Sequence, residues 1–200
     1  MNPATAPLPT TLAVHTELDP VLAAIAPLGL AAAAGRPCLV IDLDPLGPPY
    51  PGERSLADIA RDGPSRPDLG PGPRRNTRSG IAVLRNGDIT LENAADLIAG
   101  LIRHWPAVVL RLPMGQLNLM LPAPVIPVVP LLPGILAPRH PRAAVWQLGD
   151  DSVSPPGPGP ILPRLRIHQV SNLLAVQRIP QGPWVRAWRR VWELPWAIRT

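Results

Sequence analysis

The chain has no lysine, and all 19 of its basic residues are arginine. Together with the many alanines, prolines and glycines, this composition is typical of a GC-rich bacterial genome. The absence excludes a Schiff-base lysine, a lysine general base and a lysine that binds phosphate from a loop. Any function of the chain must therefore work without these three kinds of chemistry.

Cysteine and long apolar runs are almost absent as well. The single cysteine, Cys38, rules out an internal disulfide and is expected to be a small core residue. Residues 25–34 form too short a run to cross a membrane, and prolines interrupt residues 117–137. Residues 1–10 lack the basic and apolar segments of a signal peptide. We therefore expect a cytoplasmic protein.

Acidic residues are scarce in the second half of the chain. Residues 1–100 hold 8 arginines and 11 acids, a net charge of −3, whereas residues 101–200 hold 11 arginines and 3 acids, a net charge of +8. A basic half of this kind can contact nucleic acid, an anionic membrane or an acidic protein. It is also typical of a solvated arginine surface with no partner.

Proline and glycine are abundant instead, at 31 and 16 of the 200 residues. The apolar residues, 46% of the chain, still form runs that are too strong for a disordered protein. The length suits one domain with a substantial core. We expect a compact domain whose connections are stiffened by proline.

The first 42 residues predict a strand–helix–strand unit. Asp19 is a suitable helix N-cap, Pro20 suits the first helical position, and Gly35 suits the C-terminal cap. Pro27 is expected to kink or break this helix. The strands are predicted at residues 11–15 and 38–42, with the helix between them at residues 21–34.

A pair of carboxylates follows the second of these strands. Asp42 and Asp44 lie in an Asp-x-Asp-Pro turn at the carboxyl end of a buried strand, where open α/β sheets bind their ligands. One interpretation is a catalytic carboxylate pair. The other is a structural turn, because alternate residues of a strand point to opposite faces.

The succession of strand, helix and the sequence VIDLDPLG at residues 40–47 resembles the MinD/ParA group of deviant Walker-A ATPases. The resemblance implies a degenerate P-loop NTPase-like α/β fold, with a mostly parallel sheet flanked by helices. It also implies that the nucleotide loop falls on residues 15–21, between the first strand and the first helix.

This nucleotide loop has lost every residue that the resemblance implies for it. A phosphate loop needs the conformational freedom of glycine to point its N–H groups at phosphate, and it needs lysine and hydroxyl side chains. Acidic side chains would repel phosphate, and a proline removes one donor. The family's two lysines, three glycines and magnesium-binding hydroxyl are replaced here, in that order, by His15, Pro20, Thr16, Glu17, Asp19 and Val21.

A later strand, predicted at residues 107–113, resembles the family's Walker-B-like strand. Arg111 stands where that strand would carry an aspartate that positions magnesium. Because a guanidinium repels a cation, we expect Arg111 to pair with Asp42 or Asp44 across neighbouring strand ends.

The remaining elements complete an α/β domain over residues 1–149, followed over residues 150–200 by a Pro/Gly linker and a basic, Trp-rich C-terminal extension that packs on it. The prolines at residues 124–130 predict an edge strand or irregular pairing. Further predictions are a helix opened by a capping box at Ser55 and Asp58, a strand at residues 80–84, an amphipathic helix at residues 91–104, a strand at residues 142–148 and a linker at residues 150–163.

Four tryptophans recur at every fourth residue near the C-terminus. Their spacing predicts a helix between Pro183 and Pro195, with the first two tryptophans inward and one of the last two more exposed. The helix can pack on its own domain, bind a protein partner, lie on a membrane surface or contact nucleic acid. The candidate interaction surface comprises Trp184, Trp188, Trp192, Trp196, Arg186, Arg189 and Arg190.

These features predict a protein that is not an enzyme and carries no cofactor or metal, since its histidines show no metal-ligand spacing. We expect a non-catalytic interaction or regulatory protein that binds a protein partner or forms a homo-oligomer. The resemblance implies pairing with an active relative in cell division, partition, or the positioning of secretion or pilus machinery. The alternative is a residual ATP- or ADP-binding protein with a non-standard, arginine-based phosphate site.

Overall fold

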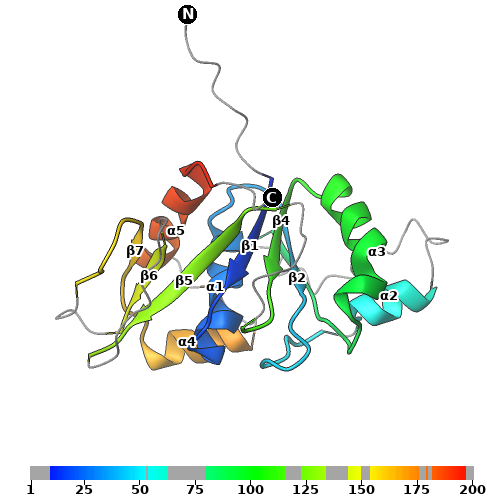
Figure 1. The fold of residues 1–200 in the computed structure, drawn as a ribbon, viewed down its shortest axis with the longest axis horizontal. Coiled ribbons are helices and arrows are strands. Elements are labelled where there is room, and N and C mark those ends of the chain that lie inside the picture. Colours follow the sequence, from blue (N-terminus) through cyan, green and yellow to red (C-terminus); the bar gives the residue numbers. More distant parts are fainter. Residues whose placement is uncertain are drawn as a thin grey trace, which may run out of the picture.

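The computed structural model describes residues 10–52, 54–62, 80–115, 123–133, 144–149, 154–175, 179 and 182–196. These residues form a seven-stranded parallel sheet with helices on both faces, so the α/β fold class is confirmed (Figure 1). The strands lie in the order β3-β2-β4-β1-β5-β6-β7. In Figure 1 their carboxyl ends point toward the bottom of the view.

Most elements lie where the apolar runs predicted them. The strands are β1 (Thr11–His15), β2 (Cys38–Asp42), β3 (Ile81–Leu84), β4 (Ala107–Arg111), β5 (Val125–Leu131), β6 (Val145–Leu148) and β7 (Ile161–Leu162). The helices are α1 (Pro20–Ala32), α2 (Leu56–Asp62), α3 (Leu91–His104), α4 (Ile167–Leu174) and α5 (Pro183–Glu193).

Helix α1 is the central element of one face of the sheet. Ten of its thirteen residues are buried, because β-strands cover it on one side and α4 and α5 cover it on the other. A helix that is apolar all round is typical of such a sandwiched position. The helix also runs through Pro27 without interruption, so the predicted break at this residue is wrong.

Helices α2 and α3 cover the opposite face of the sheet. The predicted capping box opens α2: the Ser55 hydroxyl accepts from the Asp58 N–H at 3.1 Å, and the Asp58 carboxylate accepts from the Ser55 N–H at 2.8 Å. Helix α3 is amphipathic and buries Ala94 and Ile98 against the sheet. Each face of the sheet thus has its own apolar core.

Strand β5 is internal, so of the two alternatives predicted for it the edge position is wrong and the irregular pairing is confirmed. It pairs with β1 through residues 125–127 and with β6 through residues 128–131. The Pro124 carbonyl accepts a hydrogen bond from the Ala13 N–H of β1. The backbone N–H and C=O groups of even-numbered residues of β5 therefore point toward β1, and those of odd-numbered residues point toward β6. The N–H that Pro127 lacks would point toward β6, but the pairing with β6 begins only at residue 128. The N–H that Pro130 lacks would point toward β1, but the pairing with β1 ends at residue 127. The stagger lets an internal strand contain two prolines.

The boundary predicted at residue 149 does not separate an extension from the sheet. Strand β7 lies in the predicted linker and pairs with β6, while α4, which was not predicted, packs on α1 together with α5. The described residues from 154 onward therefore complete the sheet and cover the central helix. None of the described helices has the length and apolarity needed to span a membrane.

Candidate functional site

The carboxyl edge of the sheet is where the topology predicts a site. From β1 the chain moves toward β2 and β3, and from β5 it moves in the opposite direction toward β6 and β7. Parallel α/β sheets bind ligands in the crevice at such a reversal. The candidate residues Asp42, Asp44 and Arg111 lie at this edge, as do those of the β1–α1 loop.

Arg111 bridges both aspartates, and the pairing predicted from the sequence is therefore confirmed. Its Nη1 donates to Asp42 Oδ2 at 3.2 Å, and its Nη2 donates to Asp44 Oδ2 at 3.1 Å. Arg111 is fully buried, and the two carboxylates are almost so. The three side chains form a buried ionic cluster, here called the Arg111 cluster, at the ends of two neighbouring strands.

The Arg111 cluster also fixes the loop that follows β2. Asp44 Oδ1 accepts from the N–H groups of Leu46 and Gly47, each at 3.1 Å, and Arg111 Nη1 donates to the Pro48 carbonyl at 2.7 Å. The backbone of Gly47 lies so close to the cluster that a Cβ there would collide with Arg111 and Asp44. Glycine is thus required for close approach, and the loop is held by backbone as well as side-chain bonds.

Tyr50 closes this loop against the central helix. Its ring lies 5.3 Å from the Arg111 Cζ, within range of a cation–π contact, and its hydroxyl donates to the Ala24 carbonyl at 2.6 Å. Burial raises the pKa of the Tyr50 hydroxyl, so the phenol stays neutral and remains a donor. Sequence reasoning missed Tyr50, Gly47 and Pro48, because only the folded loop brings them to Arg111.

The net charge of the Arg111 cluster is negative when both carboxylates are ionised. One guanidinium faces two buried carboxylates, and burial raises the pKa of Asp42 to about 6, against the opposing effects of Arg111 and of the Asp44 N–H. A proton on Asp42 would leave the cluster neutral. The cluster therefore contains a group that titrates near neutral pH.

The β1–α1 loop is closed by its own side chains. Asp19 caps α1 by accepting from the N–H groups of Val21 at 2.8 Å and Leu22 at 3.0 Å, and Pro20 occupies the first helical position, as predicted. A carboxylate thus takes the place at the helix N-terminus that an anion could otherwise occupy. His15 and Thr16 are buried, whereas Glu17 is exposed.

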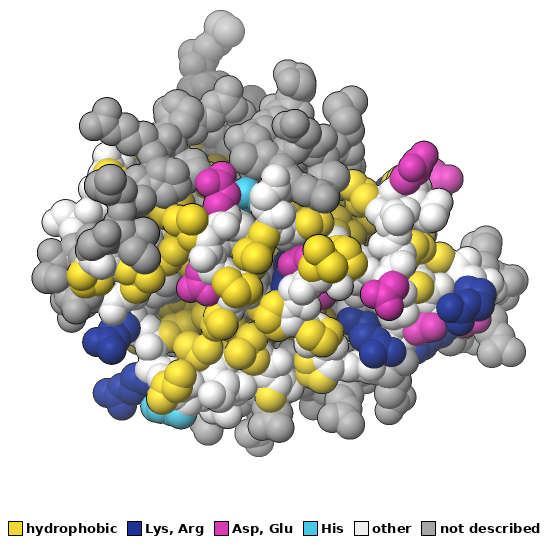
Figure 2. All heavy atoms as spheres, turned by 60° about the horizontal axis from the view of Figure 1, so that its bottom comes forward, with side chains coloured by type: hydrophobic (Ala, Val, Ile, Leu, Met, Phe, Trp, Pro, Cys, Tyr) yellow, Lys and Arg dark blue, Asp and Glu magenta, His cyan; other side chains and the backbone are white. Residues whose placement is uncertain are grey.

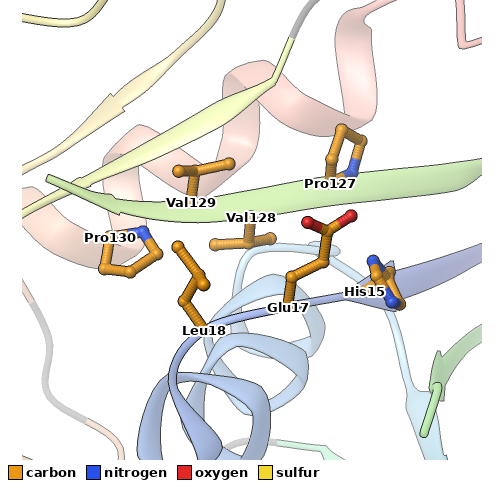
Figure 3. Close-up of a pocket in the computed structure, with 7 residues that line it drawn as sticks. All are labelled: His15, Glu17, Leu18, Pro127, Val128, Val129 and Pro130. Carbon is orange, nitrogen blue, oxygen red and sulfur yellow. The ribbon is translucent and has the colours of Figure 1, made fainter. Parts of the chain in front are cut away.

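A shallow hollow lies between this loop and β5. It is lined by His15, Glu17 and Leu18 on one side and by residues 127–130 on the other, and Figure 3 shows Glu17 and Leu18 pointing toward β5. It has room for little more than one water molecule, about 10 Å³, far below the roughly 300–1,000 Å³ of small-molecule pockets. The hollow is thus too small for a nucleotide.

The residues at this edge do not fit magnesium or a nucleotide phosphate. The two carboxylates that could bind a cation already bind Arg111, and the helix N-terminus already binds Asp19. Among the described residues, no three His, Cys, Asp or Glu side chains gather into a group that could hold a metal. Burial also raises the pKa of the Cys38 thiol to about 12, so this core residue is unreactive.

The tryptophans of α5 belong to the core and not to an interaction surface. Trp184, Trp188 and Trp192 are buried, the last with 6% of its surface exposed, while Trp196 is half-buried. The Trp192 indole donates to the Leu30 carbonyl of α1 at 2.9 Å. The first three tryptophans, Trp184, Trp188 and Trp192, are therefore ruled out as an interaction surface.

Three arginines on the outer side of α5 remain exposed, namely Arg186, Arg189 and Arg190. On the opposite side of the helix, Trp184 and Trp188 pack edge to face, with ring centroids 5.9 Å apart, directly over Gly29. The three arginines thus lie on the side of α5 away from its buried tryptophans.

No protein-family model matches the chain, and comparisons with curated proteins and with solved structures found no significant match.

Proposed function

We propose that this chain is a non-catalytic interaction or regulatory protein on a MinD/ParA-like scaffold. Its own side chains occupy the positions at which the resembled ATPases would hold magnesium and phosphate. Its role is to present the carboxyl edge of the sheet to a protein partner, such as an active relative of the same scaffold.

The observation that carries this proposal is the position of Arg111. The resemblance implies a magnesium-positioning carboxylate there, and the guanidinium lies instead within 3.2 Å of both aspartates that follow β2. A buried cation held by two carboxylates cannot be displaced by magnesium without leaving Arg111 buried and unpaired, which is strongly unfavourable.

The cap on α1 supports the same conclusion for the phosphate. Asp19 satisfies the N–H groups of Val21 and Leu22, and Glu17 adds a second carboxylate in the same loop. A phosphate brought to this helix end would have to displace Asp19 and approach both negative charges. A carboxylate of the chain itself thus takes the place of phosphate at the start of α1.

The Arg111 cluster positions a surface residue at this edge of the sheet, a role that involves no catalysis. It fixes the loop after β2 so that Leu46 projects with 94% of its surface exposed, two residues beyond Asp44. An apolar side chain on a rigid loop loses little conformational entropy when a partner covers it. Such a feature is typical of a contact residue.

Nucleotide turnover and binding test the proposal directly. We expect no ATP hydrolysis above background with magnesium, and no shift of the melting temperature with ATP or ADP. Magnesium-dependent turnover that Asp42→Ala abolishes would contradict the proposal. A nucleotide-dependent melting shift without turnover would instead favour residual nucleotide binding.

Co-purification from the native host tests the partner. We expect a protein to be recovered with the tagged wild type and to be lost with Leu46→Asp, at unchanged melting temperature. Recovery that is the same for Leu46→Asp and for the remote variant Arg189→Asp would show that this edge is not the contact surface.

A further inference from the structure

The loop that follows β2 is held in place by side chains. Among the described residues 44–52, none takes part in a hydrogen bond between two backbone groups. The N–H groups of Asp44, Leu46 and Gly47 donate instead to carboxylates of the Arg111 cluster. The four prolines of this segment have no N–H to donate. The order of the loop therefore depends on the Arg111 cluster and on Tyr50, which bonds to α1.

This loop also buries little apolar surface. None of residues 45–49 is buried, whereas Tyr50 at the far end of the loop is 2% exposed. If residues 44–50, here called the β2 loop, moved away from the sheet, the hydrogen bonds of the cluster would break and one large side chain would become exposed, while the paired strands stayed in place. A segment of this kind opens far more readily than the whole sheet unfolds.

The Arg111 cluster buries one negative charge more than it neutralises. Two carboxylates face a single guanidinium, with 1% and 4% of their side-chain surfaces exposed. The other neighbours of Asp42 supply no second cation: α1 has no charged residue, the Tyr50 phenol is neutral, and Arg85 after β3 acts on Asp58. Figure 2, which brings this edge of the sheet forward, shows the basic side chains mostly toward the sides of the face. An unbalanced buried charge is unfavourable, and either a bound proton or contact with water relieves it.

We propose that a proton on the Asp42 carboxyl group keeps the β2 loop closed and that loss of this proton opens the loop. With the proton bound, one carboxylate balances one guanidinium, and the closed loop covers a neutral cluster. Without the proton, opening of the loop admits water, which hydrates the excess charge. The β2 loop is thus a pH-sensitive switch that belongs to the fold itself. The inference is independent of the proposed function, because it requires neither a partner nor a nucleotide.

The direction of the switch follows from the pKa of Asp42. Burial raises this pKa to about 6 in the closed loop, whereas a carboxyl group in contact with water keeps a value near 3.8. The closed form is therefore favoured in full below about pH 4, and this advantage is lost as the pH rises through 6. Between pH 4 and 7.5, the ratio of open to closed molecules should rise about fiftyfold.

Amide hydrogen exchange of the full chain tests the switch. The amides of Asp44, Leu46 and Gly47 exchange when the β2 loop opens, so their protection factors, corrected for the direct effect of pH on exchange, should fall about fiftyfold between pH 4 and 7.5. They should also be at least about tenfold less protected than the amide of Val109, which lies in the middle of the sheet and exchanges only when the sheet unfolds. Protection that does not change with pH would overturn the inference, as would loop amides that exchange only together with that of Val109.

The substitution Asp42→Asn removes the proposed switch. An amide side chain does not ionise, so protection of the β2 loop should no longer change with pH in this variant. The matched control is Glu92→Gln, which removes an exposed carboxylate from α3 and should behave like the wild type. Melting curves verify that both variants are folded. A loop that keeps the wild-type pH dependence in Asp42→Asn would assign the switch to another group and overturn the inference.

A second variant tests the other anchor of the loop and leaves the Arg111 cluster complete. Tyr50→Phe keeps the buried ring and removes the hydrogen bond to the Ala24 carbonyl. We expect protection of the Leu46 and Gly47 amides to fall severalfold at every pH, while the dependence on pH remains that of the wild type. Unchanged protection in this variant would show that the loop does not open between the cluster and Tyr50, which would overturn the proposed movement.

Discussion

Asp42 and Arg111 are direct partners in the register of β2 and β4, and their side chains form a buried ion pair at 3.2 Å. The two residues are 69 positions apart in the chain. The parallel pairing of the strands places them side by side at the same edge, on the face that α1 covers. The pair lies at the centre of the cluster that fixes the loop after β2.

The pH dependence of stability should reveal the proton on Asp42. Its pKa is raised to about 6 in the folded chain from 3.8, so its contribution is present in full below about pH 4 and is lost as the pH rises through 6. The free energy of unfolding of the wild type, measured relative to Asp42→Asn, should fall over this window by on the order of 3 kcal/mol. Denaturant titrations between pH 4 and 7.5 measure it. A constant difference between the two proteins would contradict the assignment.

Removal of the guanidinium should be costly. Arg111→Ala leaves two carboxylates buried without their cation, and we expect a loss of about 3–5 kcal/mol in the free energy of unfolding. The control is Arg61→Ala, which removes an exposed pair with Asp58 and should cost less than about 0.5 kcal/mol. Equal effects of the two substitutions in urea unfolding would show that the cluster contributes nothing special.

Close packing of the loop on the cluster predicts a sensitive glycine. A Cβ at Gly47 would collide with Arg111 and Asp44, so Gly47→Ala should lower the free energy of unfolding by about 1–3 kcal/mol. The matched control is Gly52→Ala in the same loop, where the nearest atom to a Cβ is a carbonyl oxygen at 3.8 Å. Thermal melts of both variants provide the comparison, and the order of their stabilities should not reverse.

The position of α5 predicts that its tryptophans stabilise the monomer. Trp188 is fully buried against Gly29 of α1, and Trp188→Ala should cost about 3–5 kcal/mol because it opens a large cavity. Arg189→Ala, on the exposed side of the same helix, should change the free energy of unfolding by less than about 0.5 kcal/mol. If Trp188→Ala proved neutral in stability, the helix would not be part of the core.

The sequence by itself determined the elements whose signals are local. An apolar run followed by Asp-x-Asp-Pro placed β2, and an N-cap aspartate followed by proline placed the start of α1. The pairing of Arg111 with Asp42 or Asp44 was also predictable, because charged residues that end buried strands of one parallel sheet must lie at the same edge; that it binds both came from the folded loop. The amphipathic spacing of α3 and α5 likewise predicted both helices.

Only the tertiary structure decided the position of β5, the formation of β7 and the burial of the α5 tryptophans, because the local sequence signals for them were incomplete. The prolines of β5 are compatible with an internal strand because its two neighbours pair with different halves of it, which local sequence does not encode. Strand β7 has two residues and follows a Pro/Gly stretch, so it forms only because β6 offers it a free edge. The tryptophans of α5 are buried because α1 presents Gly29, a residue without a side chain, opposite Trp184 and Trp188. Burial depends on the shape of the opposing surface, and that surface comes from a segment more than 150 residues earlier in the chain.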